Sequence, residues 1–200
     1  MILPSPLPDL RTERLLLRRP IPSDIADRLA LGRDPEIYRN LGADIRNLQP
    51  LTDEQAKAWV DNIASHPAAW VIEHQGRAIG EILIDNFVEA DQRAGLIIGI
   101  LDISALGKGL GTEAIRAVAE FCFDVLGLHK LSMRVLSFNT RGIRAYERVG
   151  FVREGLERES ALIGGIWYDD VIVGLLKRDF DALRGARPTR GTAVPPQLRS

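Results

Sequence analysis

The chain has 200 residues, of which 46% are hydrophobic, and this size and composition fit one globular domain with a substantial core but not two. Its 26 basic and 27 acidic residues nearly cancel, so charge indicates neither a nucleic acid nor an anionic membrane as partner. A single cysteine, Cys122, excludes an intramolecular disulfide, and with only three scattered histidines beside it no metal site is predicted.

The N-terminal residues 1–10 are broken by prolines and lack a basic region followed by an apolar run, so no signal peptide is expected. The longest apolar stretch, 96–101, is far shorter than the roughly 20 residues that a membrane span needs. We therefore expect a soluble, cytoplasmic protein with Cys122 in its core, and we leave open whether it is a monomer or a homodimer.

In chain order, the N-terminal half is predicted to form strand 15–18, a helix from residue 22, an irregular segment 40–51, a helix 52–65 and strands 69–74, 78–85 and 93–101. Ser23 is the expected N-cap of the first helix, and Thr52 with Gln55 forms a capping-box pattern for the second. The nearly continuous apolar run of strand 93–101 predicts burial on both faces. Trp59 and Trp70 are expected to fill the core between helix 52–65 and the sheet.

The C-terminal half is predicted to form a helix 110–126, strand 131–136, a helix 139–149 closed by Gly150, and a hairpin of strands 151–159 and 167–176. An antiparallel meander combined with one β-α-β crossover predicts an α+β fold: a single-domain mixed β-sheet flanked by helices. We assign residues 1–11 to an N-terminal extension and 12–183 to the domain. Residues 184–200 contain Gly, Pro, Thr and Arg but no acid, which predicts a disordered tail.

A glycine cluster, Gly107-Lys108-Gly109-Leu110-Gly111, lies between strand 93–101 and the following helix. Glycines leave the backbone N–H groups accessible, and the helix adds its own unpaired N–H groups, so the segment suits a phosphate. The Walker spacing fails because Lys108 is followed by Gly109, and the dinucleotide spacing fails because the glycines alternate. A loop for the pyrophosphate of coenzyme A and a plain strand-helix connection both remain open at this point.

Other segments resemble the GNAT acetyltransferases, in particular the ribosomal-protein N-acetyltransferase (RimJ/RimL) type. The similar segments are Thr12–Arg18, Leu106–Ala114, Leu126–Leu131, Phe138–Gly155 and Trp167–Asp170. The resemblance covers roughly residues 12–180 and implies a GNAT acyltransferase fold. It also implies transfer of an acetyl group from acetyl-coenzyme A, as cosubstrate, to the primary amine of a protein N-terminus or of a small molecule.

The resemblance assigns roles to particular positions. Backbone N–H groups of Gly109, Leu110 and Gly111 would hold the pyrophosphate, and strand residues 98–102 would diverge from strand 131–136 to pair with the pantetheine arm and stabilise the oxyanion. Tyr146 would protonate the departing thiolate. The cofactor-binding residues implied are Ile100, Leu101, Asp102, Leu106, Gly107, Lys108, Gly109, Leu110, Gly111, Thr112, Asn139, Arg144 and Tyr146.

The sequence departs from the family where many members carry a Gln or Arg and this chain has Leu106, so Lys108 or Arg144 is expected to supply that charge. Gly95 and Ile97 stand where related sequences carry an acid, which leaves the general base unassigned. The candidates are Glu81, Asp85 and Asp102, with Glu81 the one we name.

Two other functions stay open. The chain could be an aminoglycoside-type acetyltransferase, with Asp44, Asp85, Glu89 and Asp91 forming an acidic pocket, or a coenzyme A-binding module that has lost its chemistry. Trp167 and Tyr168 could line an acceptor pocket or be a surface pair on the hairpin.

Overall fold

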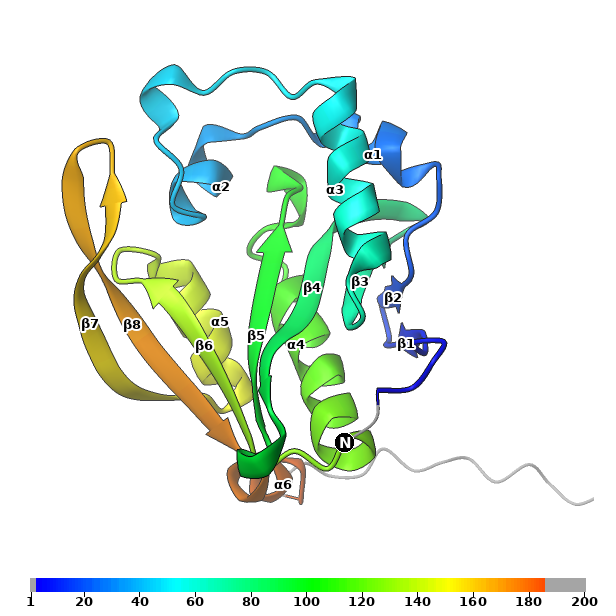
Figure 1. Cartoon of the computed structure of the whole chain (residues 1–200), viewed down its shortest axis with the longest axis vertical. Coiled ribbons are helices and arrows are strands. Elements are labelled where there is room, and N and C mark those ends of the chain that lie inside the picture. The colour runs from blue at the N-terminus through cyan, green and yellow to red at the C-terminus, as the bar shows by residue number, and fades with distance from the viewer. Residues whose placement is uncertain (1–2, 186–200) are drawn as a thin grey trace, which may run out of the picture.

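The computed structural model describes residues 3–185, which form one eight-stranded mixed sheet with helices on both faces (Figure 1). The strands are β1 (Leu10–Arg11), β2 (Leu15–Arg18), β3 (Ala69–His74), β4 (Arg77–Val88), β5 (Arg93–Ile100), β6 (Lys130–Leu136), β7 (Val152–Ile163) and β8 (Ile166–Leu176). The helices are α1 (Asp24–Leu31), α2 (Pro35–Asn40), α3 (Asp53–Ser65), α4 (Leu110–Glu120), α5 (Thr140–Val149) and α6 (Lys177–Gly185), and a π-helical turn at Phe121–Val125 extends α4. The predicted α+β fold class is confirmed.

The sheet has the order β1-β2-β3-β4-β5-β6-β8-β7, and only β5 and β6 run parallel. Their pairing covers Arg93 to Gly95 on β5 and Lys130 to Ser132 on β6 and then stops. Beyond that point β5 stays paired with β4 as far as Ile100, and β6 stays paired with β8 as far as Leu136. The two half-sheets therefore diverge toward the C-terminal ends of β5 and β6 (Figure 1), as the family resemblance implied.

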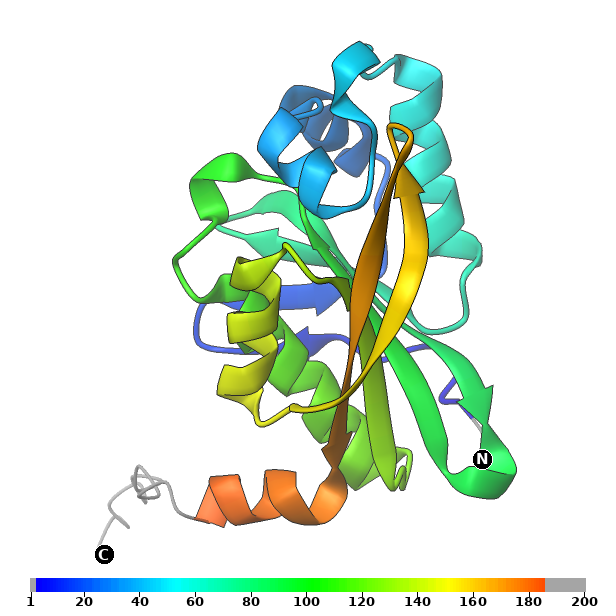
Figure 2. The same cartoon turned by 90° about the vertical axis from the view of Figure 1, so that its left-hand side faces the viewer.

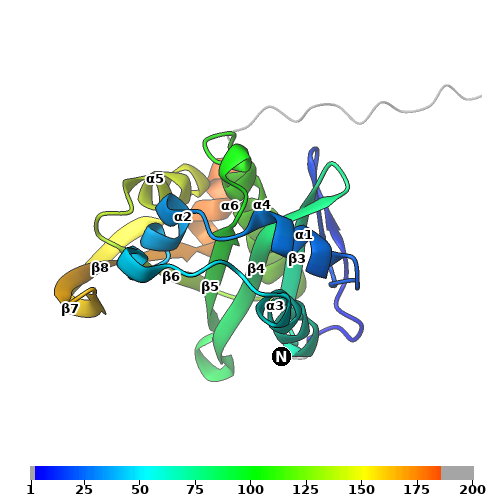
Figure 3. The ribbon, with the colours of Figure 1, turned by 90° about the horizontal axis from the view of Figure 1, so that it is seen from above.

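Side chains along each strand point alternately to the two faces of the sheet, so the core consists of two layers, one on each face. Seen from above, α3 lies on one side, while α4 and α5 lie on the other (Figure 3). On β3, Val71 packs with Ile63 of α3, whereas Trp70 belongs to the larger cluster on the α4 side. The Trp70 ring packs edge-on against the Phe121 ring, with 5.6 Å between the ring centroids. The Trp70 indole N–H donates to the Pro8 carbonyl over 2.8 Å.

The placement predicted for Trp70 is therefore wrong, because period-2 alternation turns this side chain away from α3. Trp59, on α3, is partly buried against the cluster between α3 and the sheet, as predicted. The prediction that strand 93–101 is buried on both faces is also wrong, since Ile97 of β5 is 49% exposed. Once β5 and β6 have diverged, one face of β5 borders an open hollow instead of protein.

Several local signals are confirmed. Thr52 and Gln55 form the capping box of α3, and Gly150 ends α5 at φ 118°. Ser23 occupies the N-cap position of α1 without a side-chain hydrogen bond, and Asp24 instead accepts from the Ile21 N–H over 2.8 Å. Cys122 is fully buried.

Three short elements were not predicted. Strand β1 forms from residues of the presumed N-terminal extension, α2 lies just before the segment expected to be irregular, and α6 follows β8. Helix α6 includes residues 184 and 185, so the predicted tail is wrong for these two, and its residues 186–200 lie outside the described part of the chain.

Candidate active site

The glycine loop joins the end of β5 to the first turn of α4. Gly107 and Gly109 have φ values of 73° and 79°, in the left-handed region where side chains are strained. A Cβ on Gly107 would meet nothing within 4 Å, so the loop presents open backbone. The first N–H groups of α4 have no partner within the helix, and they lie next to this opening. The loop therefore fits a phosphate group, and the pyrophosphate of coenzyme A is the phosphate that the sequence motifs predicted.

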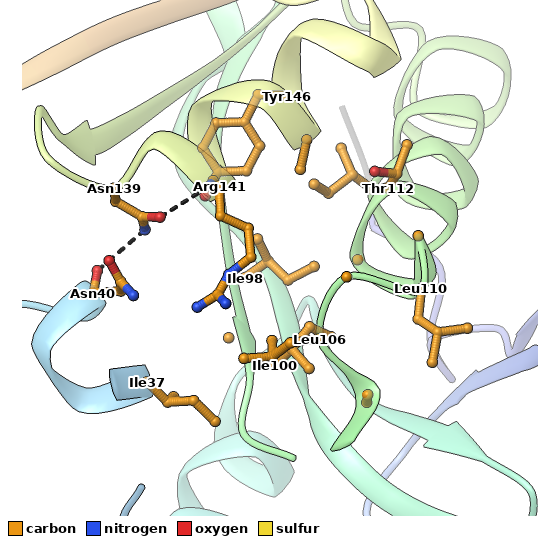
Figure 4. Close-up of a pocket in the computed structure, with 18 of the residues that line it drawn as sticks. Ile37, Asn40, Ile98, Ile100, Leu106, Leu110, Thr112, Asn139, Arg141 and Tyr146 are labelled. Carbon is orange, nitrogen blue, oxygen red and sulfur yellow. Dashed lines mark hydrogen bonds between the residues drawn. The ribbon is translucent and has the colours of Figure 1, made fainter. Parts of the chain in front are cut away.

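A first hollow extends from this loop along β5 to α5 and α2 (Figure 4). Of the predicted cofactor residues it is lined by Ile100, Leu106, Gly107, Gly109, Leu110, Gly111, Thr112, Asn139 and Tyr146. Ile98, Ile115 and Ala145 contribute further apolar lining. A narrow hollow with mostly apolar walls and an open strand backbone is suited to an extended chain with a few amide groups, such as pantetheine.

Four predicted cofactor residues do not line this hollow. Leu101 is buried, and the Asp102 carboxylate accepts from the Ser104 N–H over 2.8 Å as the cap of a short 3-10 turn. Lys108 uses its carbonyl to accept from Arg14 over 2.9 Å, and Arg144 points to solvent on α5. Neither Lys108 nor Arg144 therefore supplies the charge that was expected in place of the Gln or Arg missing at Leu106.

A second hollow, of about 690 Å³, opens between the diverging strands. Its lining includes Ile97 and Leu96 of β5, Met133 to Leu136 of β6, and Asp170 and Ile172 of β8. The tip of the β7–β8 hairpin lies beside the α2 region (Figure 2). Gly42 lies at this approach, where a Cβ would make ordinary contacts with Leu136 at 3.5 Å and Ile163 at 3.9 Å.

The two hollows share one wall, which consists of Asn40, Leu41, Ile98, Asn139 and Tyr146. Asn139 caps α5 by accepting from the Gly142 N–H over 2.9 Å, and its amide donates to the Asn40 carbonyl over 3.3 Å (Figure 4). One side chain thus fixes α5 to α2 across the site. Two molecules could bind from different sides and meet at this wall.

Tyr146 extends from α5 into the shared wall (Figure 4), and its ring packs against Phe151 at a centroid distance of 6.3 Å. Only 8% of the residue is exposed, and burial raises the pKa of Tyr146 to about 12. The phenol is therefore protonated throughout the neutral pH range. Its O–H can donate to a thiolate that departs beside it.

Glu81 lies on β4 opposite Gly99 of β5, and burial raises its pKa while the nearby positive charge of Arg28 opposes that shift only in part. Glu81 lines neither hollow. Gly99 does line the first hollow, and a Cβ at Gly99 would lie 4.0 Å from a Glu81 carboxylate oxygen. The Leu101 side chain also reaches this point, with its Cδ2 3.8 Å from the same Cβ position.

The other predicted acids are dispersed. Asp44 pairs with Arg46, and Asp85 accepts from the Asn86 N–H. Glu89 and Asp91 lie in the turn before β5, at the opposite end of this strand from the glycine loop. These acids therefore do not form the acidic pocket that an aminoglycoside would require.

Sequence reasoning missed two residues that the fold brings to the site. Asp170, 8% exposed, is the one acid among the described residues that line the second hollow, and it accepts from Arg134 over 2.8 Å. Arg14 reaches the glycine loop from a segment some 94 positions earlier in the chain. Both lie within segments that resemble the family, but no local pattern connects either to the site.

Within residues 3–185, no helix combines the length and the apolar character needed to cross a membrane. The same residues contain no cluster of three or more His, Cys, Asp or Glu side chains that could hold a metal ion.

Known proteins resemble this chain over most of its length. A family model described as an acetyltransferase (GNAT) domain matches residues 14–152. The probable N-acetyltransferase YjcK of Bacillus subtilis is 32% identical over 103 residues, which cover 52% of this chain and 57% of that protein. The uncharacterized N-acetyltransferase YokL, from prophage SPbeta of the same organism, is 29% identical over 177 residues, covering 86% of this chain and 96% of the relative.

Solved structures share the fold. A spermidine N-acetyltransferase from Vibrio cholerae, solved in complex with coenzyme A and spermine, superposes with a TM-score of 0.69 at 22% identity, and the match covers 84% of this chain and 99% of that one. The family model, the relatives and the fold agree with the motifs around Gly109 and Tyr146. The chain belongs to the GNAT acetyltransferases, enzymes that take their acetyl group from acetyl-coenzyme A.

Proposed function

We propose that this acetyltransferase acts on the primary amine of a protein N-terminus or a small molecule, with cofactor and acceptor bound in two hollows that meet at Tyr146. The observation that carries the proposal is the shared wall of Asn40, Leu41, Ile98, Asn139 and Tyr146. Direct transfer requires both reactants to be held in contact at the same time, and such a wall allows it.

On the cofactor side, Gly109, Leu110 and Gly111 donate backbone N–H groups to the pyrophosphate, and the exposed backbone of β5 from Ile98 to Ile100 pairs with the pantetheine amides. When bound, acetyl-coenzyme A supplies the acetyl group as an activated thioester. A β5 N–H donates to the carbonyl oxygen on which negative charge develops, and Tyr146 donates its phenolic proton to the leaving sulfur.

On the acceptor side, β6 has an unpaired edge toward the second hollow from Met133 to Leu136. An extended peptide can pair with such an edge, so a protein N-terminus is the acceptor that we favour. Asp170, which accepts from Arg134 over 2.8 Å, attracts the amine. Glu81, whose pKa is raised by burial, takes the amine proton through water past Gly99.

An aminoglycoside is the weaker candidate. Such a substrate carries several positive charges, whereas Asp170 is the only acid on the described lining of the second hollow and is already paired with an arginine. A polycation would gain little from this surface.

The test is a thiol-release assay with acetyl-coenzyme A and a panel of amines: short peptides with free N-termini, spermidine and kanamycin. We expect release of coenzyme A above the hydrolysis rate with a peptide or with spermidine, and none with kanamycin. Preferential acetylation of kanamycin would overturn the acceptor assignment. Tight coenzyme A binding without thiol release for any amine would instead indicate a binding module.

A further inference from the structure

A third hollow, of about 490 Å³, begins at the glycine loop and runs along the other side of α4. It shares Gly109, Thr112 and Arg148 with the first hollow, so the two are continuous at the N-terminus of α4. Its remaining lining comes from residues 11–14 and from α4, namely Arg11, Thr12, Glu13, Arg14, Glu113, Arg116, Ala117 and Glu120. The function proposed above leaves this hollow without a role.

Arg14 is fixed at the mouth of the hollow. Its Nε donates to Glu113 over 2.7 Å and its Nη1 donates to the Lys108 carbonyl over 2.9 Å. Its Nη2 forms an ion pair with Glu113 at 2.6 Å and lies 3.6 Å from the Cβ position of Gly109. A guanidinium has five N–H donors, so two remain for a ligand at the loop.

Two more arginines reach the hollow from different helices. Arg148 of α5 is exposed, and its side chain forms no hydrogen bond or ion pair with another residue in 3–185. Arg116 of α4 donates to the Arg148 carbonyl over 3.2 Å, which holds the two helices together at this point. With Arg14 they form an arginine cluster (Arg14, Arg116 and Arg148) on three separate elements.

Three acids and four arginines line the hollow, so its lining keeps a net positive charge: Glu13, Glu113 and Glu120 against Arg11, Arg14, Arg116 and Arg148. Glu113 already accepts from Thr12 Oγ1, from the Arg14 N–H and from the Arg14 guanidinium. Glu120 lies seven residues further along α4, about 10 Å from Glu113 along the helix axis. The end of the hollow next to Gly109 is therefore suited to an anion.

We infer that the arginine cluster binds the 3′-phosphate of coenzyme A, an assignment that rests on the proposed pyrophosphate site at Gly109. In coenzyme A the pantetheine and the nucleotide lie on opposite sides of the pyrophosphate. With pantetheine in the first hollow, the nucleotide leaves the loop on the far side, where the third hollow begins. The 3′-phosphate is a terminal phosphate with up to two negative charges, and arginine matches its oxygens with paired N–H donors.

The experiment compares coenzyme A with dephospho-coenzyme A, which lacks only the 3′-phosphate, by isothermal titration calorimetry at low and high salt. We expect the wild-type protein to bind coenzyme A at least about tenfold more tightly, and the preference to shrink as salt screens the charges. The double variant Arg116→Gln/Arg148→Gln should bind both ligands with affinities within about twofold of each other, at the wild-type level for dephospho-coenzyme A. Arg14→Gln should also weaken the preference, with a melting curve to check that loss of the Glu113 pair leaves the fold intact.

Arg153→Gln is the matched control, because it removes the same charge from an arginine that pairs with Glu147 at 3.1 Å outside the hollow. It should keep the full preference. Equal wild-type affinity for the two ligands would overturn the inference and leave the proposed function standing. So would a preference that survives in the double variant, since the 3′-phosphate would then lie elsewhere, for example beside Arg141 in the first hollow. If the wild-type protein bound neither ligand, the proposed function itself would fail.

Discussion

Tyr146 is the residue on which both hollows converge, and Tyr146→Phe tests its role. The change keeps the ring beside Phe151 and deletes one hydroxyl, so packing and cofactor affinity should be preserved. We expect turnover at saturating acetyl-coenzyme A to fall by about a hundredfold or more, because a general acid acts on charge that appears only in the transition state.

The dissociation constant for coenzyme A should stay within about twofold of wild type, since the hydroxyl contributes to the reaction and not to binding. Tyr168→Phe is the control, because Tyr168 packs against Phe138 and lines neither hollow. Turnover of the Tyr146 variant within twofold of wild type would leave thiolate protonation to solvent.

Glu81 gives a prediction about stability and pH. Its pKa is raised above 4.5 in the folded protein by burial, so the stability it contributes is present below its unfolded pKa and is lost as the pH rises through its folded pKa. Gln does not titrate. The melting temperature of Glu81→Gln relative to wild type should therefore be higher near about pH 7 than near about pH 4.

Glu54→Gln should show the opposite trend, because a backbone hydrogen bond in the first turn of α3 lowers the pKa of Glu54. Its stabilising effect is present above the unfolded pKa and is lost as the pH falls. Differential scanning fluorimetry at the two pH values measures both variants. An identical pH trend for the two would mean that burial does not govern Glu81.

At the scale of elements, the first turn of α4 can be tested with Gly111→Val. Gly111 has an ordinary φ, and a Cβ there would lie 3.6 Å from Ile100 and 4.0 Å from Ile98, so the fold should tolerate it. The additional methyl groups occupy the first hollow, which both isoleucines line. We expect acetyl-coenzyme A affinity to fall by at least about tenfold, or ~1.4 kcal/mol, with little change in melting temperature.

Gly155→Val is the control, since a Cβ on this β7 residue meets nothing within 4 Å. Gly109→Val should lower both affinity and stability, because φ 79° forces a valine into a backbone conformation that costs about 1–3 kcal/mol. Calorimetry that shows unchanged affinity in both loop variants would mean that the loop only connects β5 to α4.

Elements with strong local signals could be predicted from the sequence. The capping box at Thr52 and the glycine cap at Gly150 each rest on residues within a few positions of one another, and both form. The exposed face of β5 could not be predicted, because an apolar run is the same whether its partner is a strand or a bound ligand. The side of the sheet on which Trp70 lies depends on the register with β4, which composition does not determine.

At the scale of the whole molecule, the site is built from segments that are distant in the chain. The motifs around Gly109 and Tyr146 made the cofactor side predictable through family resemblance. Arg14 and Asp170 could not be assigned, because their positions depend on the hydrogen bonds from Arg14 to Glu113, 99 positions away, and from Arg134 to Asp170, 36 positions away. Such contacts exist only once the sheet has formed.

The divergence of β5 and β6 leads to the last prediction. A ligand that binds only the native state stabilises it, by about 2.7 kcal/mol when the ligand is at a hundredfold excess over its dissociation constant. For a domain of this size, that free energy corresponds to a rise of about 5–10 °C in melting temperature. We expect acetyl-coenzyme A to produce this shift, whereas ATP and NAD, which lack pantetheine to fill the first hollow, should produce a smaller one.

Hydrogen exchange then locates the effect. Amides of β5 from Ile98 to Ile100 and of residues 105–107 and 109–111 should exchange more slowly with ligand bound, because these residues line the first hollow and lack partners from β6. Amides of β2 and β3, which pair with each other from Leu15 to Arg18, should exchange at unchanged rates. A melting temperature that ATP or NAD raises and acetyl-coenzyme A does not, or protection confined to β2 and β3, would contradict a cofactor bound between the half-sheets.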